Sequence, residues 1–134
     1  MKLSNCHNFQ DFRKLARRRL PSPIFHYIDG AADDEITHRR NTLAYDDVDL
    51  VPSVLAGVDN VDLSTTIFGR KIELPLYCAP TALQRLFHHE GERAVAKAAQ
   101  KYRTMFGVSS LGTVSVEEIG AMIDTPKMFQ FYFH

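Results

Sequence analysis

The stretch TMFGVSSLGTVSVEEIGAMIDTPKMFQFYF, residues 104–133, decides the fold because it places a helix between two apolar runs. Residues 104–110 are almost wholly apolar or small, which is typical of a β-strand that is covered on both faces. Ser115 and Glu118, three residues apart, form a capping box, which predicts that a helix begins there. In residues 127–133 phenylalanines alternate with polar residues, and this period of two predicts a second strand.

Two further elements lie directly upstream. The run PLYCAP at 75–80 indicates another buried strand, and EGERAVAKAAQKYR at 90–103 carries a stripe of alanine and valine at helical spacing. The order is therefore strand, helix, strand, helix, strand, which indicates a parallel sheet with right-handed crossovers. We expect an α/β fold.

The first half of the chain is expected to be mostly helical. Asn8 is suited to start a helix, and Pro21 is suited to stop it. The expected elements, in chain order, are a helix over 8–20, a short helix broken at Gly30, a helix from the acidic residues 33–35 to about Leu43, an irregular segment over 49–64 and a β-hairpin over 65–74. We expect one domain over 1–134, made of a helical segment (1–64), the hairpin (65–74) and the first βα units of the sheet (75–134).

The composition is that of an ordinary globular protein. Its 16 basic and 16 acidic side chains give zero formal charge, so we expect no nucleic-acid partner. Two cysteines far apart in sequence, with no apolar leader segment, predict a reduced, cytoplasmic protein. The basic run at 13–20 leaves open a peripheral contact with the inner face of the membrane. The adjacent His88 and His89 cannot easily converge on one ion, so we expect no metal site.

Ligands of parallel βα folds bind at the C-terminal ends of the strands. The residues that this rule selects are small, polar or backbone-exposing; they are Ala79, Pro80, Thr81, Ala82, Ser109, Ser110, Leu111, Gly112, Gln130 and Tyr132. Accessible backbone amides beside polar side chains suit a planar heteroaromatic cofactor. The dinucleotide motif GxGxxG and the P-loop are absent from the sequence. The alternative is that Ser109 and Gln130 only satisfy the backbone of the loops.

Four segments together resemble one known family. They are PSPIFHYIDGAADDEITHRRN (21–41), LPLYCAPTALQRLFHHEGE (74–92), SSLGTVSVEEI (109–119) and FQFYFH (129–134). Their order and spacing are similar to those of the FMN-dependent 2-hydroxy acid dehydrogenases and oxidases, which include glycolate oxidase and L-lactate dehydrogenases. The resemblance implies a (β/α)8 TIM barrel that follows an N-terminal helical segment and a small hairpin. This chain would then contain the first three barrel strands.

The resemblance also implies a role for each residue that matches the motifs of the family. The residues implied to contact FMN are Ala79, Pro80, Thr81, Ala82, Ser109 and Gln130. Tyr27 would hold the substrate carboxylate, and Tyr132 would lie near the substrate oxygen that is oxidised. Leu111 stands where glycolate oxidase has tryptophan and the flavocytochrome lactate dehydrogenases have leucine, which favours L-lactate or a somewhat larger 2-hydroxy acid over glycolate.

The resemblance further implies what the 134 residues would lack. In this family a histidine removes the substrate proton and an arginine binds the carboxylate. Both would lie beyond residue 134, so no catalytic residue is expected within the chain. A (β/α)8 barrel takes roughly 250 residues. We therefore expect the N-terminal part of such an enzyme, inactive by itself, and a tetramer-like homo-oligomer for the whole protein.

The expected reaction is the oxidation of an L-2-hydroxy acid, with L-lactate converted to pyruvate. The electron acceptor, which could be oxygen, a quinone or a cytochrome, stays open. Two alternatives stay open as well. One is a different hydroxy acid, such as glycolate or a longer chain. The other is a small non-catalytic binding or assembly module whose sheet edge at 127–133 is covered by another copy.

Overall fold

The computed structural model of the chain describes residues 2–133. The chain divides into two compact units, Met1–Gly57 and Val58–His134, and each is described by itself. Within the described range, no helix combines the length and the apolar character that crossing a membrane requires.

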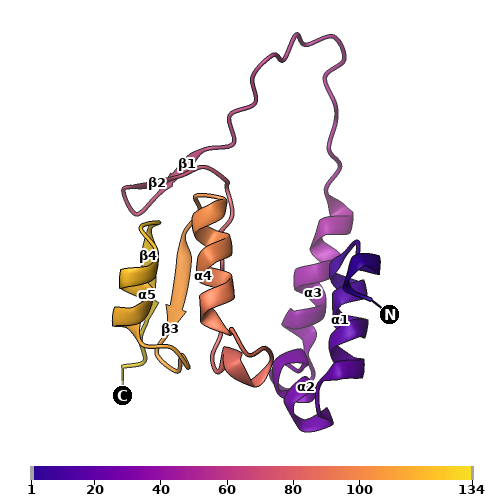
Figure 1. Cartoon of the computed structure of the whole chain (residues 1–134). Helices are drawn as coiled ribbons and strands as arrows, with labels where there is room; N and C mark the ends of the chain where they lie inside the picture. The colour runs from indigo at the N-terminus through magenta and orange to yellow at the C-terminus, as the bar shows by residue number, and fades with distance from the viewer. Residues whose placement is uncertain (1, 134) are drawn as a thin grey trace. The chain divides into compact units, whose positions relative to one another are not determined.

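The first unit is helical (Figure 1). It consists of a 3-10 turn (Leu3–Asn5), α1 (Phe9–Arg19), α2 (Ser22–Asp29), α3 (Ile36–Leu43) and a second 3-10 turn (Ala44–Asp47). The Asn8 side chain caps α1, because its oxygen accepts a hydrogen bond of 3.0 Å from the amide of Asp11. The Arg13 guanidinium pairs with the Asp29 carboxylate at 2.5 and 2.9 Å, which joins α1 to α2. The helix predicted over 8–20 and the break at Gly30 are confirmed.

The third helix begins later than predicted. The acidic residues 33–35 precede α3 and do not form its first turn, because Asp33 and Glu35 have left-handed backbone with φ of 47° and 57°. Left-handed residues cannot form part of a right-handed helix. The Glu35 carboxylate instead accepts a hydrogen bond of 3.1 Å from the amide of Ala31, which closes the turn before the helix.

The second unit opens with the predicted hairpin. Strands β1 (Thr65–Ile67) and β2 (Arg70–Ile72) pair antiparallel, with Thr65 opposite Ile72. The two turn residues, Phe68 and Gly69, both have positive φ, of 49° and 72°. This is the type I′ turn, whose twist matches that of the flanking strands, and a glycine adopts it without steric cost.

A small parallel sheet carries the rest of the unit. Strands β3 (Phe106–Ser109) and β4 (Lys127–Gln130) pair in parallel, and α4 (Glu92–Lys101) and α5 (Val116–Met122) precede one strand each. The residue Cys78 joins the sheet beside β3 through a parallel bridge to Phe106, so three segments lie parallel in chain order. The predicted alternation of parallel strands and helices is confirmed in this part of the chain.

The first predicted strand is much shorter than expected. Of residues 75–80, only Cys78 bridges to β3, donating its amide to Met105 at 3.0 Å and accepting from Gly107 at 2.8 Å. Pro75 and Pro80 at the two ends have no N–H to donate, so the ladder cannot extend over the whole run.

The third predicted strand is also shorter, because β4 ends at Gln130 and not at 133. The chain turns after Ser109 on the neighbouring strand, where the Gly112 amide donates to the Ser109 carbonyl at 3.0 Å. Residues 131–133 therefore have no strand to pair with. The phenylalanines of this run consequently lie at the surface of the described chain. Phe131 is 70% exposed and Phe133 93%, since no described element covers them.

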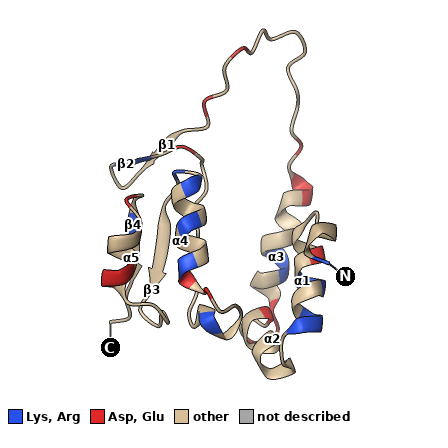
Figure 2. Cartoon of the chain, in the orientation of Figure 1, with Lys and Arg blue, Asp and Glu red and all other residues tan. Residues whose placement is uncertain are grey.

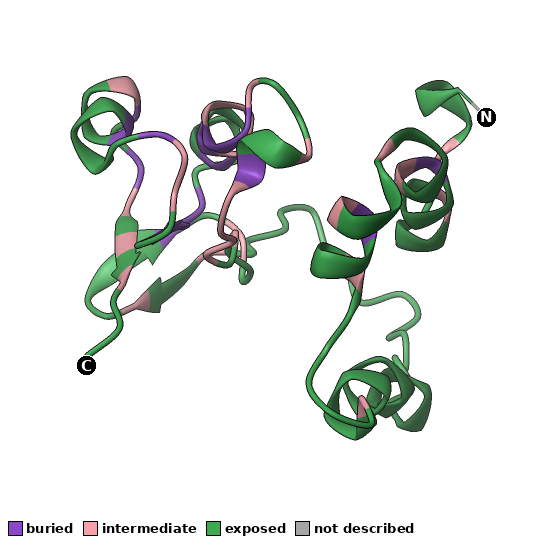
Figure 3. Cartoon of the chain, turned by 90° about the horizontal axis from the view of Figure 1, so that it is seen from below, coloured by how far each residue is buried: buried purple, intermediate pink, exposed green. Residues whose placement is uncertain are grey.

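The core of the second unit lies where the two helices meet the strands (Figure 3). Its buried members are Ala96, Ala99, Phe106, Val108, Val114, Ile119 and Ile123. The small alanines of α4 let that helix approach β3 closely, and the alternate residues Phe106 and Val108 of β3 point toward the helices. The other side chains of β3 consequently point to the opposite face of the sheet.

Candidate functional site

Ser109 and Gln130 end the two strands and lie side by side. They are the last residues of β3 and β4 and are paired in register, so their side chains emerge on the same face of the sheet. That face is opposite to the one that Val108 presents to the core. The structure therefore brings these two predicted cofactor residues together at the C-terminal edge, as the sequence predicts.

Both side chains already bond the neighbouring loop. The Ser109 hydroxyl accepts from the amide of Leu111 at 3.1 Å, and the Gln130 side-chain oxygen accepts from the amide and hydroxyl of Ser110 at 3.3 and 3.1 Å. The alternative that they satisfy loop backbone is thus true of their acceptor atoms. Their donor groups are not used in this way. Within residues 2–133, the Ser109 hydroxyl hydrogen and the Gln130 side-chain NH2 group donate to no protein atom.

The segment after Cys78 supplies the backbone part of the same edge. Gly107 lets it pass close to β3, since a Cβ added there would lie 2.6 Å from Pro80 Cδ and 3.0 Å from the Cys78 carbonyl oxygen. Thr81 and Ala82 are half-buried, and neither amide donates to a protein acceptor in the part of the chain that the structure describes.

The loops that follow the first two strand segments contact one another directly. The amide of Leu83 donates to the carbonyl of Leu111 at 3.0 Å, and the Gln84 side-chain amide donates to the carbonyl of Thr81 at 3.2 Å. Leu111 is 50% exposed on its loop. The predicted substrate-pocket residue thus lies beside the predicted cofactor segment.

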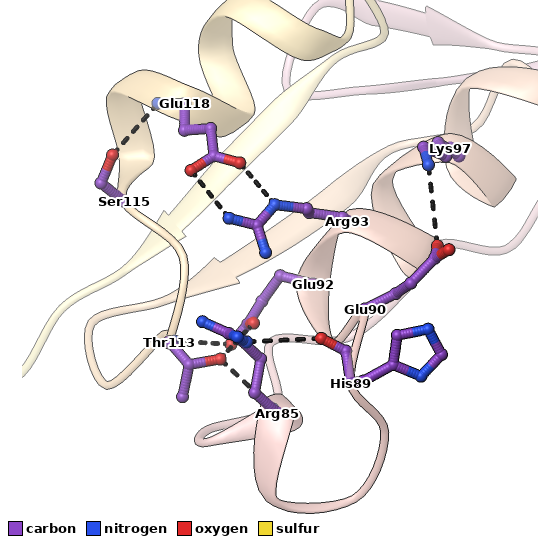
Figure 4. Close-up of polar contacts among 9 residues, drawn as sticks. All are labelled: Arg85, His89, Glu90, Glu92, Arg93, Lys97, Thr113, Ser115 and Glu118. Carbon is purple, nitrogen blue, oxygen red and sulfur yellow. Dashed lines mark hydrogen bonds and ion pairs between the residues drawn. The ribbon is translucent and has the colours of Figure 1, made fainter.

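A buried carboxylate joins these loops to α4 (Figure 4). Glu92 Oε1 accepts from the amide of Thr113 at 2.7 Å and from the amide of Gln84 at 3.4 Å, and its Oε2 accepts from the Thr113 hydroxyl at 2.5 Å. Burial acts to raise the pKa of the Glu92 carboxyl, but the hydroxyl and amide donors outweigh burial and hold that pKa below its ordinary value. The carboxylate form is therefore the stable one.

Nothing in the sequence distinguishes Glu92 from an ordinary first-turn acid, and its role was not predicted. A nearby ion pair clamps α4 to α5: the Arg93 guanidinium pairs with the Glu118 carboxylate at 2.5 and 3.1 Å (Figure 4). The Ser115 hydroxyl accepts from the Glu118 amide at 3.2 Å, which confirms the predicted start of α5.

The structure does not bring the two predicted tyrosines, Tyr27 and Tyr132, to the strand ends in the way that it brings Ser109 and Gln130 there. Tyr132 follows Gln130 by two residues, beyond the end of β4, and is about half exposed. Tyr27 lies on α2 in the other unit, and its contact with a substrate stays a prediction.

Three other features of the described residues were compared with this edge: metal-ligand clusters, the Cys78 thiol and a surface hollow. Among residues 2–133, no three histidine, cysteine, aspartate or glutamate side chains come together as a metal site would require. Burial raises the pKa of the Cys78 thiol, so it is a neutral core group at physiological pH. A surface hollow lined by Ala31, Ile36, His38 and their neighbours contains none of the predicted site residues.

The profile of the FMN-dependent dehydrogenase family matches residues 16–134. The chain belongs to this family. It is 37% identical over 125 residues to glycolate oxidase of Spinacia oleracea, covering 93% of this chain and 34% of that protein. It is 38% identical over 122 residues to L-lactate dehydrogenase of Pectobacterium atrosepticum, covering 91% of this chain and 32% of that one.

Solved structures agree with this membership. A mandelate oxidase variant crystallised with an FMN adduct superposes with a TM-score of 0.83 at 38% identity, covering 91% of this chain and 37% of that chain. The fold is therefore part of the TIM barrel of the FMN-dependent 2-hydroxy acid oxidoreductases, and the cofactor of the family is FMN. The chain spans about a third of the length of the curated relatives that it matches.

The residues at the edge fit FMN. The pyrimidine part of a flavin carries carbonyl oxygens and ring nitrogens that accept hydrogen bonds, and the edge offers donors from Ser109, Gln130 and the amides of Thr81 and Ala82. Gly107 leaves room for the Pro80 ring beside this edge, since an added Cβ would lie 2.6 Å from Pro80 Cδ.

Proposed function

We propose that the whole protein oxidises an L-2-hydroxy acid to the 2-oxo acid with FMN, and that L-lactate is its preferred substrate. The observation that carries the proposal is the in-register pair of Ser109 and Gln130 beside the 79–82 segment, in a chain that belongs to an FMN-dependent family. Relatives named for lactate and for glycolate match about equally well, so the substrate is argued from Leu111.

When bound, FMN would accept the hydride equivalent, which is two electrons and a proton, that is removed from the hydroxyl-bearing carbon. The residues of this chain bind and orient. In the proposal, the Ser109 hydroxyl and the Gln130 amide donate to the polar edge of the ring, while the amides of Thr81 and Ala82 approach its face. Tyr27 holds the carboxylate of the substrate, and Tyr132 donates to its hydroxyl oxygen.

The base that takes the substrate proton and the arginine that binds its carboxylate are assigned to the part of the relatives that this chain does not span. Residues 1–134 alone are then expected to be inactive. The competing proposal, a non-catalytic assembly module, draws support from the exposed phenylalanines after β4. It predicts a discrete, colourless oligomer.

Location and assembly belong to the same proposal. A cytoplasmic protein with peripheral contact at the membrane is supported by the basic last turn of α1, which carries Arg17, Arg18 and Arg19 (Figure 2). A homo-oligomer is proposed from the resemblance alone.

Flavin affinity tests the cofactor half of the proposal. In the whole protein, Gln130→Leu removes one donor to the ring, and we expect FMN to dissociate on the order of tenfold more readily. Gln10→Leu, on the exposed face of α1, is the matched control and should leave the affinity unchanged. The measurement is titration of the apoprotein with FMN, followed by flavin fluorescence. Equal affinities for the two variants would contradict the assignment of Gln130.

A further inference from the structure

Glu92 is buried although the comparable acids of the next helix are not. It begins α4 and is 1% exposed, whereas Glu117 and Glu118 in the first turn of α5 are exposed. An acid that only complements a helix dipole has no need of burial, because that effect operates at the surface. Burying a carboxylate is costly unless donors surround it, and Glu92 is surrounded by them.

The donors come from two different loops. Gln84 belongs to the loop that follows the 79–82 segment. Thr113 belongs to the loop that begins after Ser109 and carries Leu111 (Figure 4). One carboxylate therefore links both walls of the proposed flavin edge to the first turn of α4.

Two neighbouring hydrogen bonds also join these two loops and depend on the distance between them. The Leu83 amide donates to the Leu111 carbonyl at 3.0 Å, one residue away from the Gln84 contact. The Arg85 amide donates to the Thr113 hydroxyl at 3.2 Å, so that hydroxyl accepts from one loop while it donates to the carboxylate. If the carboxylate is lost, the two loops lose their common acceptor.

We propose that Glu92 is a positioning residue that sets the separation of these two loops and thereby the width of the flavin edge. Its consequence for FMN rests on the proposed function. A carboxylate suits this place, because three donors converge on its two oxygens and both oxygens accept. Glutamine has the same size but no charge, and its NH2 group cannot accept from the Thr113 hydroxyl, which would have to turn and accept instead.

Backbone hydrogen exchange in the whole protein tests the positioning directly. In Glu92→Gln, we expect the amides of Leu83, Leu111 and Gly112 to exchange on the order of tenfold faster. The amides of Phe106 and Gly107, in the sheet, should stay within about twofold of their original rates. An equal acceleration of both groups would mean that Glu92 supports the whole fold, and no acceleration would mean that it supports neither loop. Either result overturns the proposal.

Substitutions at Thr113, the hydrogen-bond partner of Glu92, distinguish the effect of the hydrogen bond from the effect of side-chain volume. Thr113→Val removes the hydroxyl and should reproduce the fast exchange, whereas Thr113→Ser keeps the hydroxyl and should restore slow exchange. Glu90→Gln is the control for charge, because the partly exposed Glu90 carboxylate pairs with the Lys97 ammonium at 3.6 Å and, among the residues that the structure describes, with no other side chain (Figure 4). Fast loop exchange in Glu90→Gln, or in Thr113→Ser, would contradict the proposal.

Titration with FMN gives a second readout. We expect Glu92→Gln to weaken FMN binding on the order of tenfold, in keeping with the loss of a charged hydrogen bond beside the site. Undiminished affinity in Glu92→Gln would contradict the proposal. Failure of the unaltered protein to bind FMN would instead count against the proposed function, and the exchange rates would still decide the role of Glu92.

Discussion

Gly107 shows how one residue determines how closely the strands approach. Its position opposite the 78–80 segment leaves no room for a side chain, because an added Cβ would lie 2.6 Å from Pro80 Cδ and 2.7 Å from Pro80 N. Backbone atoms cannot move aside as the end of a long side chain can. We infer that the close approach of the 78–80 segment to β3 depends on this glycine.

Gly107→Ala should therefore lower the free energy of unfolding by about 1–3 kcal/mol, the usual cost of overpacking a close contact. Gly120→Ala is the matched control. Gly120 lies inside α5 with nothing within 4 Å of an added Cβ, so alanine there should raise stability by about 0.5–1 kcal/mol. Urea unfolding of the whole protein measures both. Equal stability of the two variants would show that the close approach costs nothing.

Leu111 is the residue from which substrate preference is argued. It lies half-exposed on the loop after β3, beside the cofactor segment. In the proposed function, a tryptophan there would fill space next to the methyl group of L-lactate. Leu111→Trp should therefore lower kcat/KM for L-lactate relative to glycolate by about 10-fold or more, as expected for a change in a small hydrophobic pocket. Steady-state kinetics with both acids check it. If the ratio of the two kcat/KM values does not change, Leu111 does not line the substrate pocket.

At the scale of elements, local chemistry predicted the starts of helices better than the lengths of strands. The Asn8 and Ser115 caps were predicted because capping depends on neighbours in sequence. Strand lengths depend on partners elsewhere in the chain. The run at 75–80 is limited by prolines at its ends, and the run at 127–133 is limited by the turn after Ser109.

In the candidate site, too, one part was predicted from the sequence and another was not. The strand ends were predicted because parallel strands bring their C-terminal residues together. The role of Glu92 could not be predicted, because its partners lie 8 and 21 residues away and only the folded loops bring them to it.

The junction of α4 with the two loops should be sensitive to acid. Since the pKa of Glu92 is lowered in the folded protein from its ordinary 4.5, its carboxylate stabilises the fold fully above that value. This stabilisation is lost as the pH falls through the lowered pKa. The stability advantage of the unaltered protein over Glu92→Gln should thus shrink below about pH 4.5. Urea unfolding at a series of pH values measures it, and an advantage that is constant with pH would contradict this reasoning.

At the scale of the whole molecule, the relatives that the chain matches are about three times as long. In the proposed function, the edge formed by residues 79–82, Ser109 and Gln130 is one wall of a flavin site. Binding and orientation are then proposed for this chain, and proton removal for the part of the relatives that it does not span.

Anaerobic mixing of the purified whole protein with L-lactate is the sharpest test of the proposed reaction. The protein should carry FMN, and L-lactate should bleach the visible flavin absorbance faster than glycolate or mandelate does. Pyruvate should form in an amount equal to the flavin reduced. Residues 1–134 alone serve as the control and should show no bleaching. A protein without FMN, or flavin that L-lactate reduces no faster than glycolate does, would contradict the account.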